Sequence, residues 1–313
     1  MKKQFLILAV LFALLIQSSN FVVTKTMVDS LNPYLIASLR AIIPALVIPL
    51  LFLFKKPLIA KTSKDIRLLI ICALGNFVWF PLLSTYGLSL TSASEASLIF
   101  SFSPIFTIIL CHFYLNDKLT IRRSIGVILA AIGVLIIISP SLGNLSKGNW
   151  IGDILVLIAT VGSGISYVAS VQLVRSLNSY SVISFSVLIG GIILSFVFVF
   201  GGFWRYVNLM DLKSWIGVIY IGIFGVLISN GLILYAVRYA SAITLSSTTF
   251  ITPFLSIILA VFILDESISL IDILSGIIIL TGVYFTKYEK SDGLGKFLKG
   301  GDIHESNTSN SKS

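Results

Sequence analysis

Residues 93–115 read ASEASLIFSFSPIFTIILCHFYL, and residues 242–264 read AITLSSTTFITPFLSIILAVFIL. Each stretch is long and apolar enough to cross a bilayer as a helix, which takes about 20 residues. Each also carries a proline near its middle, Pro104 in the first and Pro253 in the second. A proline inside a helix removes a backbone hydrogen bond and frees the carbonyl four residues earlier. We therefore expect two broken helices. Such breaks either line a cavity or are ordinary kinks absorbed by packing, and their symmetric placement favours a cavity.

The two stretches belong to a longer internal repeat. At an offset of 149 residues, Tyr86–Val134 aligns without a gap to Tyr235–Val283, and 13 of the 49 positions are identical. The acidic turn residues Asp117 and Glu266 also coincide. Self-similarity at a fixed offset indicates a duplicated structural unit.

The composition indicates an all-α polytopic membrane protein. Of the 313 residues, 57% are apolar and 11% are charged, whereas soluble domains carry about 25% charged residues. The apolar runs predict ten transmembrane helices, near residues 5–23, 33–54, 67–88, 93–114, 121–139, 150–173, 181–200, 214–236, 242–264 and 270–286.

These ten spans divide into two copies of five, at residues 1–140 and 141–287. The polar residues 288–313 have the composition of a disordered tail. Because five is an odd number, the second copy is expected to cross the membrane in the opposite orientation to the first. Inverted repeats of this kind are typical of secondary transporters, in which two exchangeable halves alternate between an inward-open and an outward-open state.

The positive charges predict the orientation. With a cytoplasmic N-terminus, 17 of the 22 Lys and Arg residues fall in cytoplasmic segments and 4 on the opposite side. The positive-inside rule then places both termini in the cytoplasm, in a cell membrane. Lys2 and Lys3 before an apolar run also fit a signal peptide, but the run continues through Val23 and no small-residue cleavage pattern follows.

The repeat resembles the EamA family of the drug/metabolite transporter superfamily. The residues that carry the resemblance are Ala93, Ala96, Pro104 and Asp117, their recurrence as Ala242, Pro253 and Asp265-Glu266, and Asn20-Phe21, Lys25, Pro33 and Arg40 in the first two spans. The resemblance covers residues 5 to about 286 and implies a ten-helix fold, export of metabolites or drugs, and a cavity built from both copies. Where that family often has Trp-Gly in the first helix, this chain has Gln17-Ser18, which argues against an aromatic stacking role there.

Charged residues inside membrane spans are candidates for function because burying them costs free energy. Arg40 and Glu95 lie at depths that would let them meet, as a gate or cavity rim. The alternatives are a structural ion pair or side chains that extend to the nearby membrane interface. Glu95 is the best candidate for proton coupling. Asp153 and Asp272 stand at the starts of spans, where a carboxylate favours the helix dipole.

Polar and aromatic residues cluster around the two prolines, and each hydroxyl serves either a ligand or helix packing. The candidate cavity residues are Gln17, Asn20, Arg40, Asn76, Trp79, Glu95, Ser97, Ser101, Pro104, Tyr167, Asn230, Tyr235, Ser247, Thr248 and Pro253.

The sequence lacks the motifs of several other classes. It has no phosphate-binding G-x-x-x-x-G-K-[ST] loop, no nucleophile elbow in a suitable context and no nucleic-acid module, and its two histidines, His112 and His304, do not make a metal site. We therefore expect no cofactor and no enzymatic activity.

The leading interpretation is a secondary transporter that exports a small metabolite, amino acid or drug-like solute by alternating access. The alternatives are a membrane-embedded lipid-handling protein, an intramembrane enzyme or a channel. The expected partners are a small-molecule solute and the lipid bilayer. Proton coupling and homo-oligomerisation stay open.

Overall fold

The structure is a computed structural model that describes residues 2–115, 121–143, 149–237 and 251–287. Every regular element in these residues is helical. In chain order the helices are α1 (Lys2–Val28), α2 (Pro33–Phe54), α3 (Ser63–Leu74), the π-helix η1 (Gly75–Trp79), α4 (Phe80–Leu88), α5 (Ala93–Phe100), α6 (Ser103–Leu115), α7 (Ile121–Gly143), α8 (Asn149–Ser176), α9 (Ser179–Phe200), the 3-10 helix η3 (Phe203–Leu209), α10 (Leu212–Ile219), the π-helix η4 (Tyr220–Ile228), α11 (Ser229–Ala236), α13 (Ile251–Leu264) and α14 (Leu270–Lys287).

Helices occupy all ten ranges in which spans are expected, the ninth only from Ile251 onward among the described residues. Six helical runs in the described part of the chain are long and apolar enough to cross a membrane by length and composition. They are Leu6–Val28, Pro33–Phe54, Ser63–Leu88, Trp150–Val174, Ser179–Phe200 and Leu212–Ala236. Two of these runs contain a π-helical segment, η1 and η4.

Local capping residues set where several of these helices begin. The side-chain oxygen of Asn32 accepts a hydrogen bond from the Tyr34 N–H at 2.9 Å, at the start of α2. Asn178 does the same for the Ser181 N–H at 2.7 Å, at the start of α9. Such caps satisfy backbone donors that the first helical turn leaves unpaired.

Helix packing follows the 149-residue offset. Shifting the chain by that offset brings the starts of α1, α2 and α7 to within three residues of the starts of α8, α9 and α14. The helix α1 packs on α13 and α11, and its counterpart α8 packs on α6 and α4. In the same way, α2 packs on η4, and its counterpart α9 packs on η1. Each of these contacts therefore has a counterpart in which the two halves of the chain have exchanged roles.

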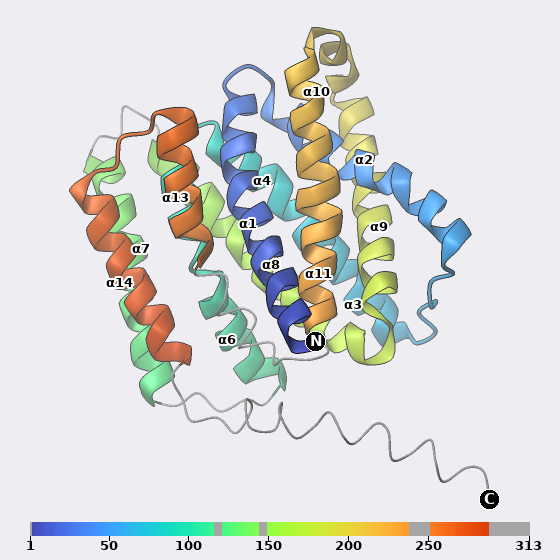
Figure 1. The fold of residues 1–313 in the computed structure, drawn as a ribbon, viewed down its shortest axis with the longest axis horizontal. Helices are drawn as coiled ribbons and strands as arrows, with labels where there is room; N and C mark the ends of the chain where they lie inside the picture. Colours follow the sequence, from blue (N-terminus) through green and yellow to red (C-terminus); the bar gives the residue numbers. More distant parts are fainter. Residues whose placement is uncertain (1, 116–120, 144–148, 238–250, 288–313) are drawn as a thin grey trace, which may run out of the picture.

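The pair α7 and α14 lies side by side at one edge of the bundle, whereas α1 lies near its middle (Figure 1). Two glycines at matched repeat positions let this pair approach closely. A Cβ atom on Gly133 would lie 2.9 Å from the Ile279 nitrogen, and one on Gly282 would lie 2.6 Å from the Gly126 oxygen. Small residues at a helix interface allow such backbone contact in membranes.

Candidate solute-binding cavity

A cavity of about 110 Å³ lies between helices from both halves of the chain. Its walls come from α1, α2, η1, α4, α6, α8, α9, η4 and α11, with Phe100 at the end of α5. Among the described residues its polar lining is Gln17, Asn20, Thr24, Arg40, Asn76, Ser84, Ser103, Thr107, Ser163, Ser166, Tyr167, Ser170, Ser186 and Asn230. A concave site of mixed apolar and polar lining is the usual form of a small-molecule site.

Six residues expected at a cavity do line it. They are Gln17, Asn20, Arg40, Asn76, Tyr167 and Asn230. The two amides connect the halves directly, because Asn76 Nδ2 donates to Asn230 Oδ1 at 3.3 Å. Asn230 Nδ2 in turn lies 2.9 Å from the Val226 oxygen and 3.2 Å from the Gly225 oxygen, both in the π-helix η4.

Arg40 is the one charged residue among the described residues that line the cavity. Its side chain is buried, with 9% of its surface exposed, and its Cζ lies 5.7 Å from the centre of the Phe80 ring. The Nε atom has no hydrogen-bond partner among the described residues. The prediction that Arg40 meets Glu95 is wrong. The one ion pair among the described residues joins Lys25 to Asp29 instead.

Glu95 instead closes the N-terminal end of α5. Its Oε2 atom accepts hydrogen bonds from the Ser92 N–H at 3.2 Å and from the Thr91 hydroxyl at 2.7 Å. The Glu95 N–H donates to Ser92 Oγ at 3.0 Å, which completes a capping box. A carboxylate at this position satisfies orphan backbone donors and favours the helix dipole.

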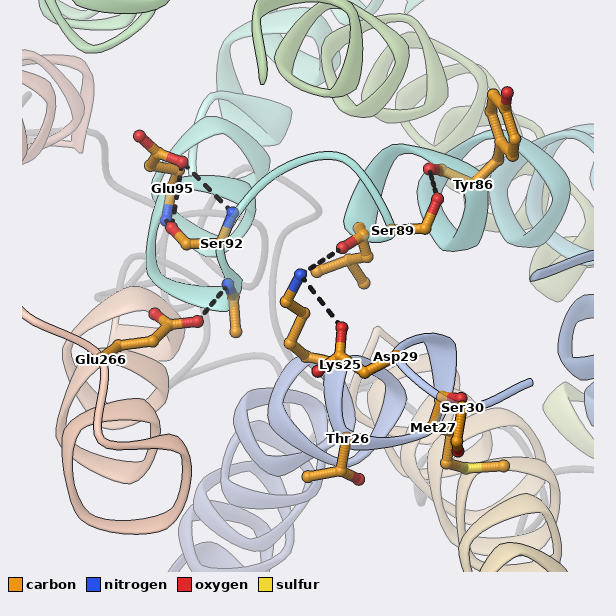
Figure 2. Close-up of polar contacts among 12 residues, drawn as sticks. Lys25, Thr26, Met27, Asp29, Ser30, Tyr86, Ser89, Ser92, Glu95 and Glu266 are labelled. Carbon is orange, nitrogen blue, oxygen red and sulfur yellow. Dashed lines mark hydrogen bonds and ion pairs between the residues drawn. The ribbon is translucent and has the colours of Figure 1, made fainter. Parts of the chain in front are cut away.

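A second carboxylate reaches the same helix end from the other half of the chain. Glu266, in the segment before α14, accepts the Ala93 N–H at 2.8 Å and the Ser94 N–H at 3.1 Å. Ser94 Oγ adds a further bond to Glu266 at 2.6 Å. Figure 2 shows the Glu95 carboxylate turned back to Ser92 at the start of α5, and Glu266 reaching the same helix end from the other half of the chain. The start of α5 is thus fixed by contacts within and between the halves.

Asp153, expected at the start of a span where a carboxylate favours the helix dipole, also contacts the residue before this capping box. It is buried, with 1% of its surface exposed, and its Oδ1 atom lies 2.6 Å from Thr91 Oγ1. The same Thr91 oxygen lies 2.7 Å from Glu95 Oε2. A hydroxyl has one proton to donate. Both short contacts are full hydrogen bonds only when one of the two carboxyl groups is itself protonated and donates to Thr91.

The expected break at Pro104 is confirmed by the helix bounds. Helix α5 ends at Phe100, and α6 begins at Ser103, so that Pro104 is its second residue. A proline is tolerated there because the first turn has no intrahelical partner for that N–H. Phe100 and Ser103, on the two sides of the break, both line the cavity. The expected break at Pro253 stays untested, because the residues from 238 to 250 lie outside the described ones.

The remaining expected cavity residues are not among those that line it. Trp79 is half exposed, and its indole N–H donates to the Ile158 oxygen at 3.1 Å, because Gly162 leaves room for the ring. Ser97 and Ser101 donate back to carbonyls of their own helix, those of Ser94 and Leu98.

Tyr235 is 40% exposed, and Pro253 is buried in the first turn of α13. Neither lines the cavity in the described part of the chain. Ser247 and Thr248 lie outside the described residues, as does the side chain of Pro104.

The aromatic wall of the cavity has no clear signal in the sequence. Phe100 packs against Phe21 and against Phe80, with ring centres 5.4 Å apart in both pairs. Because 12% of the chain is aromatic, these three rings do not stand out. A row of serines on α8 does have a signal, since Ser163, Ser166 and Ser170 share one helical face at spacings of three and four.

Comparisons with known proteins agree with this architecture. The model of the EamA-like transporter family matches residues 4–139 and again residues 150–288. The uncharacterized transporter YoaV of Bacillus subtilis is 22% identical over 290 residues, covering 90% of this chain and 96% of that protein. A WAT1-related chloroplastic protein of Arabidopsis thaliana is 26% identical over 288 residues, covering 87% of this chain and 66% of that protein.

A solved crystal structure has a similar fold. Its TM-score is 0.62 at 16% sequence identity, and the match covers 91% of this chain and 97% of the other. The family model matches nearly all of the chain outside the tail. The chain therefore belongs to the EamA-like transporter family, and it is a multi-pass membrane protein.

Proposed function

We propose that this chain is a secondary transporter that exports a small metabolite, amino acid or drug-like solute by alternating access. The two copies, residues 1–140 and 141–287, would each contribute five transmembrane helices, in opposite orientations. The observation that carries the proposal is the exchange of helix contacts around the cavity, in which α1 with α13 and α11 mirrors α8 with α6 and α4. A structure with this exchange has two states of similar free energy, related by swapping the copies.

The orientation is part of the proposal. Both termini lie in the cytoplasm, which puts the Glu95, Glu266 and Asp153 carboxylates at the extracytoplasmic end of the bundle. Reporter fusions after Ser141 and after residue 290 test this arrangement. An extracytoplasmic signal at the first position and a cytoplasmic one at the second are expected, and any other combination contradicts the inverted copies.

Alternating access itself is tested at the contact between Glu266 and α5. This contact ties the two halves together at one end of the bundle, so it has to open when that end opens. Ser94→Cys together with Glu266→Cys, joined by a short bifunctional thiol reagent, should stop transport, and reduction of a cleavable linker should restore it. The single variants treated in the same way are the controls. Full transport by the linked protein would favour a channel.

The substrate is identified by comparing exported metabolites from cells with and without the protein. A solute whose export depends on the chain then serves for vesicle assays. The alternative of an intramembrane enzyme requires a matched acid and base at one depth. Arg40 and Glu95 were the candidates for such a pair, and they do not form an ion pair among the described residues. The lipid-handling alternative would require that no soluble metabolite is exported.

The proposal includes proton coupling, with Glu95 as the group that carries the proton. The support is the shared Thr91 hydroxyl, which connects Glu95 to Asp153 and leaves room for one proton within the group. The other charged groups bonded at this end are Glu266, which accepts from the start of α5, and Lys25 of α1, which pairs with Asp29 just after that helix. In liposomes, Glu95→Gln should abolish proton-driven accumulation and leave passive exchange intact. Full accumulation by this variant would make Glu95 structural.

A further inference from the structure

Arg40 is buried at the cavity, and no group in the described part of the chain balances its charge. Among the described residues it has no carboxylate within ion-pair distance, and its Nε atom has no hydrogen-bond partner. Burying an unpaired charge is costly, and more so within a membrane. The face of the Phe80 ring, 5.7 Å from Cζ, stabilises the cation in part. It offers no acceptor for the guanidinium N–H groups, which are five donors in a planar fork.

The wall beside Arg40 combines a cation with apolar rings. Phe80 packs on Phe100, and Phe100 packs on Phe21, so that the three rings form one continuous surface that lines the cavity. Asn20 and Ser84 line it too, and they supply short polar groups on neighbouring helices. A ligand that fits such a wall has a compact anionic group and an apolar body.

We propose that the cavity binds a small amphipathic organic anion, with its carboxylate on Arg40 and its apolar part against Phe21, Phe80 and Phe100. This inference rests on the proposed transport function and names the chemical class of its substrate. The guanidinium fork pairs with both oxygens of a carboxylate, which a lysine does not reproduce. The free energy lost by burying Arg40 unpaired is recovered when the anion binds.

The test measures binding without transport. Purified protein in an uncharged, lipid-free detergent is heated with phenylacetate, with the neutral phenylacetamide or with the cationic phenethylamine. These three probes share a ring and differ in charge. We expect phenylacetate to raise the unfolding midpoint and the other two to leave it unchanged. Equal shifts from all three probes would overturn the proposal, and this comparison needs no variant to fold.

Variants locate the effect. Arg40→Gln should weaken phenylacetate binding by roughly tenfold or more, since it removes a charge-assisted hydrogen bond, and Arg40→Lys should keep only part of it. Arg205→Gln is the matched control, because Arg205 is exposed and lies over Trp204. Unchanged binding in Arg40→Gln would contradict the site.

Two further arms separate the sources of an anion. Chloride at the same concentration should not stabilise the protein, and an equal shift would exclude a role for the apolar rings. Phosphatidylglycerol tests whether the ligand is a lipid headgroup. If this lipid raises the unfolding midpoint in an Arg40-dependent way and phenylacetate does not, the proposal of a solute ligand is wrong. Because all arms run without a membrane gradient, anion binding with no transport in vesicles would contradict only the proposed function. Transport of neutral solutes with no anion binding would contradict only the site.

Discussion

Two described regions of the molecule hold buried or partly buried charged groups, and the two regions differ in whether those groups have partners. At the start of α5, Glu95 and Glu266 accept hydrogen bonds from backbone N–H groups, and Asp153 lies against the Thr91 hydroxyl. In the cavity, Arg40 is buried but has no acceptor among the described residues. The first arrangement stabilises the folded state it belongs to, whereas the second lowers stability unless a ligand is bound. A charge inside a span therefore indicates function most clearly where its partners are missing.

Removing the hydroxyl at the centre of the carboxylate group should have the largest effect. Thr91→Val keeps the shape of a buried side chain but removes the hydroxyl contact to Glu95 Oε2 and the one to Asp153 Oδ1, while Ser92 still donates to Glu95. We expect a loss of about 2–4 kcal/mol in the free energy of unfolding, because two hydrogen bonds to charged groups are lost and each contributes about 1.5–3 kcal/mol. Chemical denaturation in detergent measures it.

The control for this substitution is Thr281→Val. Thr281 is exposed and donates only to the Ile277 oxygen of its own helix. It should change stability by less than about 0.5 kcal/mol. Equal effects at Thr91 and Thr281 would show that the carboxylates are not held through the shared hydroxyl.

Replacing the arginine of the cavity should have the opposite sign. Arg40→Met keeps an unbranched side chain of similar length and removes a buried charge that has no partner in the described structure. We expect the ligand-free protein to gain about 1–3 kcal/mol in stability, the range seen when buried ions are replaced by apolar groups. Denaturation of Arg205→Met, an exposed arginine, should show almost no change. Destabilisation by Arg40→Met would show that Arg40 contributes to the fold rather than to ligand binding.

A comparison of two capping carboxylates should distinguish the effect of a cap on stability from the effect of a contact between the halves on transport. Glu266 caps α5 from the opposite half, whereas Asp272 accepts the Ser269 N–H at 2.8 Å within its own helix start. Alanine at either position should cost about 1 kcal/mol of stability. Only Glu266→Ala is expected to change the rate of transport, because only Glu266 ties together parts that move apart. Matching transport rates in the two variants would argue that the Glu266 contact persists through the cycle.

The sequence predicts a large part of this architecture for physical reasons. Continuous apolar runs place the helices, since backbone groups in lipid must be satisfied within each segment. Pro104 marks the break between α5 and α6, because a proline cannot continue the backbone bonding of a helix. The repeat offset also anticipates that Gly133 and Gly282 serve the same close contact.

The contents of the cavity are less predictable. Hydroxyls at helical spacing serve either a ligand or their own backbone, and Ser97 and Ser101 turn out to bond their own helix. The depth of a charge along a span does not determine its direction around the helix axis. For that reason Arg40 and Glu95, placed at depths that would let them meet, do not pair. Thr91 and Ser92 are the partners of Glu95 instead.

A carboxylate cap outside the spans should show the smallest effect of this series. Asp211, the N-cap of α10, is exposed and accepts the Ser214 N–H at 2.9 Å. Hydrogen bonds from the Ser214 side chain and backbone hold the pKa of Asp211 below its usual value. Because the folded-state pKa is lowered, this cap contributes its full stability above the ordinary Asp pKa of about 3.9. That contribution is lost as the pH falls through the lower folded-state value.

Asp211→Asn isolates the contribution, since asparagine caps a helix about as well as aspartate but does not titrate in this range. Unfolding midpoints of the two proteins should agree closely near pH 6, and the wild type should lose slightly more stability than the variant on going to about pH 3. Other carboxylates titrate in both proteins, so their effects cancel in the difference. Parallel losses would mean that this exposed cap does not respond to its own charge. The loss of stability expected for Thr91→Val would then be caused by the burial of its carboxylate partners and not by helix capping.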